Sequence, residues 1–174
     1  IKRIMAYTTI DKSSLHFNTK LYTGTGSSNA QTGIGFTPSF TWIKSRSNTY
    51  SHTLTDAVRG VTKHNASNSS NAEYTSTTEI TSFDSDGFTV GTDAGVNNNG
   101  STFASWNWKA NGQGSSNTDG TINTTYTSAN TTSGFSIVKW TGTGANATVG
   151  HGLGVAPKMI LFKNLNTATD WDVY

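Results

Sequence analysis

The chain has 174 residues, of which 33% are hydrophobic and 13% are charged, and its net charge is +2. Gly, Ser, Thr and Asn supply most of its polarity and favour strands and turns over helices, while 11% aromatic residues argue against disorder. Scattered basic residues argue against a nucleic-acid partner, the absence of cysteine excludes disulfides and thiol chemistry, and no apolar run is long enough for membrane insertion.

In chain order the sequence predicts an N-terminal segment over 1–16 and a first β repeat over 17–110. Within that repeat, strands are expected at about 19–24, 39–45, 51–55, 78–83, 87–91 and 102–109. Only residues 54–61 could form a short helix. A Gly-, Ser- and Asn-rich linker is expected over 111–120, and a second, incomplete repeat over 121–174 has strands at about 135–141 and 158–163.

The division of the chain into two repeats rests on internal sequence repetition. The segment Tyr22-Thr23-Gly24-Thr25-Gly26 recurs 118 positions later, beginning at Trp140. The segment Gly35-Phe36-Thr37-Pro38 recurs 119 positions later, beginning at Gly154, and each copy runs on into an apolar stretch that ends in lysine. Since the second copy stops before segments 83–90 and 103–108 could reappear, we expect the natural chain to continue beyond residue 174.

The segment 103–108 shows the alternation of a strand. Alternation places Trp106 and Trp108 on one face, and Phe103, Ser105 and Asn107 on the other. Two tryptophans on one face favour the core of a sandwich over a sugar-stacking platform.

Two charged segments could carry chemistry. Asp84-Ser85-Asp86-Gly87 resembles the start of a calcium loop, but no further acidic ligand follows, which favours a tight hairpin turn. The cluster Asp56-Ala57-Val58-Arg59-Gly60 favours an ion pair or a capped turn over a substrate clamp.

No constellation in the sequence predicts a catalytic residue, a metal site or a cofactor. The four histidines occur singly, without a metal-ligand spacing. No Gly-x-Ser-x-Gly elbow occurs, and nothing fixes the separation of the carboxylates that could act on a glycosidic bond. We therefore expect a protein that is not an enzyme, and a polysaccharide-cleaving activity is the weakest of the alternatives.

Several segments together carry a resemblance to a known family; they are 5–11, 17–26, 42–47, 56–60, 83–88 and 106–110. They resemble an uncharacterised β-rich repeat domain found in tail-fibre and appendage proteins of marine bacteriophages. The resemblance implies an antiparallel β-sandwich of the jelly-roll or lectin-like kind, a place on the virion surface and no assigned catalytic residue. It also implies that Met5 lies close to the true start of the chain.

The leading functional hypothesis is a virion structural appendage module, in a tail fibre or a capsid-decorating fibre, that contributes to host attachment. Such a module is expected to form a homo-oligomer and to contact other virion proteins. The alternative is a carbohydrate-binding, lectin-like module that recognises a host surface glycan. For that alternative, the candidate stacking residues in loops are Tyr50, Tyr74 and Trp171.

Overall fold

The computed structural model describes residues 10–174, and its regular structure is nearly all β, with 35% strand, 4% helix and antiparallel sheets. The predicted all-β, sandwich-like class is confirmed. The predicted start at Met5 lies outside the described residues.

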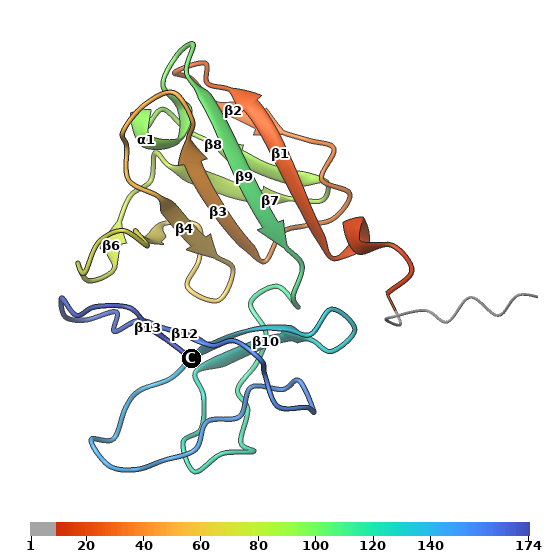
Figure 1. The fold of residues 1–174 in the computed structure, drawn as a ribbon, viewed down its shortest axis with the longest axis vertical. Coiled ribbons are helices and arrows are strands. Elements are labelled where there is room, and N and C mark those ends of the chain that lie inside the picture. The colour runs from red at the N-terminus through yellow and green to blue at the C-terminus, as the bar shows by residue number, and fades with distance from the viewer. Residues whose placement is uncertain (1–9) are drawn as a thin grey trace, which may run out of the picture.

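A six-stranded sheet forms one layer of the sandwich. Across the sheet, the strands are β1 (Phe17–Thr23), β9 (Thr102–Trp108), β3 (Phe40–Ser45), β4 (Thr53–Asp56), β5 (Lys63–Asn65) and β6 (Tyr74–Thr75). A short 3-10 turn, Ser13–Leu15, precedes β1. Strand β9 pairs with β1 on one side and with β3 on the other. It thereby joins the two ends of the first repeat within one sheet (Figure 1).

A three-stranded sheet lies behind the six-stranded sheet in Figure 1 and forms the second layer. Its strands across the sheet are β2 (Asn29–Gln31), β8 (Gly87–Val90) and β7 (Ile80–Asp84). The core between the layers consists of Tyr22, Ile34, Phe36, Ile43, Ile80, Phe88, Val90, Val96 and Phe103. Burial of each large apolar side chain in this core stabilises the fold by about 1.5–3 kcal/mol.

The remaining strands form two hairpins below the sandwich in Figure 1. One hairpin pairs β10 (Tyr126–Asn130) with β11 (Phe135–Lys139), and the other pairs β12 (Leu161–Phe162) with β13 (Asp172–Val173). The ring of Phe135 stacks on Trp108 of β9, with 5.9 Å between ring centroids. Segment 111–120 is attached to both parts, because Gly112 N donates to Ser39 Oγ and Asn111 N donates to Ser128 Oγ. The boundaries at 110 and 120 stay a prediction.

Each predicted strand overlaps an observed one, and residues 54–61, the one segment that could have formed a short helix, contain no helix. Residues 53–56 form strand β4 instead, in which Thr53 pairs with Ile43 and Leu54 pairs with Trp42. The one α-helix of the described residues is α1 (Ala94–Asn97), which the Asp93 side chain caps by accepting from Gly95 N.

Candidate functional site

A hollow of about 260 Å³ lies on the outer face of the six-stranded sheet and is lined by Trp42, His52, Trp106 and Trp108. We call these four residues the aromatic groove. Trp42 of β3 lies directly opposite Trp106 of β9, and strand alternation sends both side chains away from the core. Their rings meet edge to face at a centroid distance of 6.4 Å.

Polar atoms of the groove are arranged around His52. The indole N–H of Trp42 donates to His52 Nδ1 at 2.7 Å, so the ring hydrogen of neutral His52 lies on Nε2. Burial lowers the pKa of His52, and the nearby Lys44 charge lowers it further, which keeps the ring neutral at pH 7. The indole N–H groups of Trp106 and Trp108 have no acceptor among residues 10–174.

This arrangement suits a ligand that has both an apolar face and hydroxyl groups. The partly exposed rings of Trp42 and Trp106 offer flat surfaces for stacking, whereas the ring of Trp108 already stacks on Phe135. Free indole N–H groups offer donors at the edges of those surfaces. Sugar rings present the complementary pattern of apolar faces and hydroxyl groups.

The prediction that Trp106 and Trp108 belong to the sandwich core is wrong. Alternation along β9 places them on one face, but that face is half-buried and outermost. The inner face carries Phe103, Ser105 and Asn107, all fully buried. Hydrogen bonds explain this arrangement: Asn107 Nδ2 donates to Ser105 Oγ and to the carbonyl of Asn18, so the polar groups are satisfied inside.

The structure places the three predicted stacking residues in different surroundings. Tyr50 is an exposed residue of the loop between β3 and β4. Tyr74 lies in β6, where its hydroxyl donates to Glu79 and its ring packs beside His64. Trp171 precedes β13 and donates its indole N–H to the carbonyls of Ala66 and Ser69. No ring contact or hydrogen bond between described residues joins any two of the three.

Sequence reasoning missed Trp42 and His52 as partners of the β9 tryptophans. The alternation of residues could have indicated Trp42, since it lies opposite Trp106 on a second predicted strand. Nothing in the sequence indicated that β3 and β9 are neighbours, because they are distant along the chain.

A buried ionic cluster lies at the other end of the large sheet, around Arg59. Its guanidinium contacts Asp56 Oδ2 at 2.5 Å and Glu73 Oε2 at 3.2 Å, and it also donates to Asn65. Asp56 further accepts from the backbone N–H of Arg59 at 2.8 Å. The predicted ion pair and capped turn are therefore confirmed. This cluster has a structural role, because its charged groups pair with one another within the fold.

Beside this cluster, Glu79 and His64 face each other, with 3.7 Å between Oε2 and Nδ1. Burial raises the pKa of Glu79 to about 7 and lowers the pKa of His64 to about 4. Thr55 Oγ1 lies 2.6 Å from His64 Nδ1, which gives the appearance of a catalytic arrangement. Thr55 and His64 are both fully buried, so no substrate can reach them.

The Asp84–Gly87 segment is a hairpin turn between β7 and β8, as predicted. Asp86 accepts hydrogen bonds from Gly33 N at 2.9 Å and from Gly35 N at 2.7 Å, and these bonds lower its pKa. Within the described part of the chain, no three His, Cys, Asp or Glu side chains gather as metal ligands would. No helix between residues 10 and 174 is long and apolar enough to cross a membrane.

The fold and the groove define an all-β, antiparallel, sandwich-like protein with an aromatic hollow on its larger sheet. The chain belongs to the DUF7483 family, described as a domain of unknown function, whose model matches residues 12–174. No curated protein and no solved structure matches the chain.

Proposed function

We propose that this chain is a structural appendage module that contributes to host attachment by binding a surface glycan in the aromatic groove. The glycan-binding part of this proposal rests on the aromatic groove. Its half-exposed indoles are supported by a rigid sheet on which Trp42, Trp106 and Trp108 hold fixed relative positions.

The appendage half of the proposal places the module on the virion surface, in a homo-oligomer with other virion proteins. It rests on the resemblance to phage appendage domains and on the repetition of the module within one chain. Repetition along a fibre multiplies weak glycan contacts into avidity. The alternative is a free carbohydrate-binding module with the same groove.

The proposed function is not enzymatic and assigns no catalytic residue. Asp56 and Glu73 form ion pairs with Arg59. Glu79 is buried and accepts a hydrogen bond from Tyr74. None of the three offers a free carboxylate to a substrate.

A glycan array tests the binding site. We expect the wild-type chain, displayed at high valency, to bind a subset of glycans, and Trp106→Ala to reduce that binding at least about tenfold through loss of stacking. Trp140→Ala removes an exposed tryptophan outside the groove and is expected to retain binding. Circular dichroism and the unfolding midpoint establish that both variants are folded. Absence of binding by the wild-type chain, or equal binding by Trp106→Ala, would reject the groove.

The appendage location has a separate test. An antibody against the chain, applied to purified particles, is expected to label tail or capsid projections in electron micrographs. Unlabelled particles, together with glycan binding by the free chain, would favour the free lectin.

A further inference from the structure

The second repeat reproduces part of the first at the level of strand register. In the first repeat, Trp42 pairs with Leu54 and Ile43 pairs with Thr53. In the second, Leu161 pairs with Val173 and Phe162 pairs with Asp172. All four positions are displaced by 119, the offset of the sequence repeat, so β12–β13 is the counterpart of β3–β4.

Backbone conformation repeats at the same offset. Gly33 and Gly35 have φ values of +83° and +89°, and their counterparts Gly152 and Gly154 have +70° and +73°. These are left-handed conformations that glycine adopts readily. The two loops are therefore built alike, although their surroundings differ.

Within residues 10–174, the second repeat has no counterpart of β9. In the first repeat, β9 lies between β1 and β3 and pairs with both. Strand β11 is the counterpart of β1 at an offset of 118, and β12 is the counterpart of β3. Within residues 10–174, β11 pairs only with β10, and β12 pairs only with β13. By correspondence with β1 and β3, the place for a strand between β11 and β12 is unfilled among the described residues.

Exposure of the apolar residues agrees with this comparison. Three side chains of the first core, Tyr22, Phe36 and Ile43, are at most 8% exposed. Their counterparts in the second repeat are Trp140, Val155 and Phe162, whose exposed fractions are 36%, 69% and 37%. The second repeat thus has the apolar positions of a core without the layer that covers them.

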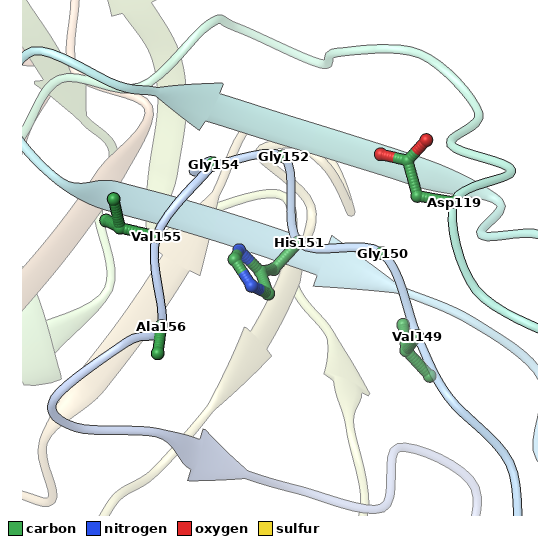
Figure 2. A pocket seen from close by; sticks show the side chains of 8 residues that line it. All are labelled: Asp119, Val149, Gly150, His151, Gly152, Gly154, Val155 and Ala156. Carbon is green, nitrogen blue, oxygen red and sulfur yellow. The ribbon is translucent and has the colours of Figure 1, made fainter.

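A glycine-lined hollow of about 380 Å³ marks where part of that layer would contact the second repeat (Figure 2). In the first repeat, the Asp86 carboxylate accepts from the N–H groups of Gly33 and Gly35. The equivalent N–H groups of Gly152 and Gly154, which line the hollow, have no acceptor among the described residues. In the hollow, the intervening amide of Leu153 donates to His151 Nδ1.

Asp119 supplies the acidic side chain among the residues that line the hollow. His151 lies between the glycines and Asp119, and Figure 2 shows Asp119 at the end of the lining away from Gly154. An acidic turn that docks at Gly152 and Gly154 therefore enters at the end away from the Asp119 carboxylate.

We propose that the second repeat is a receptor for a further polypeptide segment of the β7–β9 type. Such a segment has an Asp-Gly hairpin turn, followed by a strand in which serine and asparagine alternate with tryptophan. The acidic turn accepts from Gly152 and Gly154, and the strand pairs between β11 and β12. A second copy of this chain is not the occupant, because its own β7–β9 residues fill its first sandwich.

The test adds a synthetic peptide of residues 80–109 to the full chain labelled with ¹⁵N-glycine. We expect saturable downfield shifts of the Gly152 and Gly154 amides, with those of Gly33 and Gly35 unchanged. Asp86→Asn in the peptide removes the charged acceptor and is expected to weaken binding about tenfold. Ser105→Pro in the peptide is expected to abolish binding, because proline interrupts the central strand. A scrambled peptide is the matched control.

A fusion guards against poor solubility of the peptide. The same segment, joined to residue 174 by a flexible Gly-Ser linker, is expected to slow hydrogen exchange in β11 and β12 at least about tenfold. Absence of protection in the fusion together with absence of peptide shifts would overturn the proposal. A dimer of the unmodified chain that Phe162→Asp dissociates would also overturn it, since a second copy would then be the occupant.

Discussion

Glu79 and His64 illustrate how burial sets the pH dependence of this fold at the scale of single residues. A glutamic acid with a folded pKa of about 7 holds its proton more tightly than in the unfolded chain, where the pKa is near 4.5. The native state therefore binds more protons between these values, and this contribution to stability is lost as pH rises from about 4.5 to 7. His64 acts in the opposite direction, because its pKa falls from 6.5 to about 4 and its contribution is lost as pH falls.

Glu79→Gln isolates the glutamate, because glutamine resembles the protonated acid at every pH. We expect the free energy of unfolding of this variant, relative to wild type, to rise by about 2 kcal/mol between pH 5 and pH 8. Urea unfolding at several pH values measures the difference. Glu73→Gln is the control of opposite sign, since at pH 8 it removes an ion-pair partner of Arg59 and destabilises the fold. A pH-independent difference for Glu79→Gln would show that burial does not hold the proton.

Single residues also show where sequence reasoning reached its limit. Alternation correctly grouped Trp106 with Trp108, but it gives two faces without saying which one is inside. By hydrophobicity alone, the face that carries the two tryptophans was expected to point into the core. The decisive factor was the hydrogen bonding of Asn107 with Ser105 and Asn18, which depends on strand neighbours that the sequence does not reveal.

At the scale of elements, the short helix α1 connects the two sheets through one side chain. Asn97 is fully buried, and its Nδ2 donates to the carbonyls of Ser27 and Gly91. Its Oδ1 accepts from the backbone N–H of Thr25 and from Asn29 Nδ2. The repeated Thr-Gly-Thr-Gly turn of the first repeat is thus held by a residue far along the chain.

Asn97→Ala removes all four of these hydrogen bonds and leaves buried backbone groups without partners. We expect it to destabilise the chain by about 3 kcal/mol, as measured by urea unfolding. Asn99→Ala, at an exposed position near the same helix, is the matched control and is expected to change stability by less than about 0.5 kcal/mol. Equal effects of the two substitutions would mean that the Asn97 network contributes little.

The sequence predicted the longer elements better than the short ones. Strands with alternating or continuous apolar patterns, such as β3 and β9, were located within a few residues. Strands β2, β5, β6 and β13 have two or three residues each and were missed, and so was the five-residue strand β10. Such short strands carry too little periodicity to be recognised, because their position is set by pairing with neighbours.

At the scale of the whole molecule, the two repeats meet at an aromatic contact. Phe135 of β11 packs against Phe40 and Trp108, with centroid distances of 6.1 Å and 5.9 Å. Removing this ring weakens the contact between repeats without removing a residue of the core of the first repeat.

We expect Phe135→Ala to accelerate proteolytic cleavage within 111–120 at least about tenfold, since the hydrogen bond from Gly112 N to Ser39 Oγ is what then ties that segment to the first repeat. The unfolding midpoint of the first repeat is expected to stay nearly unchanged. Mass spectrometry of the fragments locates the cut. Trp140→Ala, which leaves the Phe135 contacts intact, is the control. An unchanged rate of cleavage would indicate that the repeats are held together by other contacts.

The central position of β9 also has a consequence for the order of folding. Lys20 and Ser105, which face each other across β1 and β9, are 85 positions apart, so a ribosome needs roughly 4 to 17 s to make the strand that completes the sheet. During synthesis β9 emerges before β11 and β12 exist, and it can pair only with its native neighbours. In a chain diluted from denaturant, both pairs of strands compete for β9 at once, and swapped pairings become accessible. Vectorial synthesis therefore protects this repeated architecture from an error that refolding in the test tube permits.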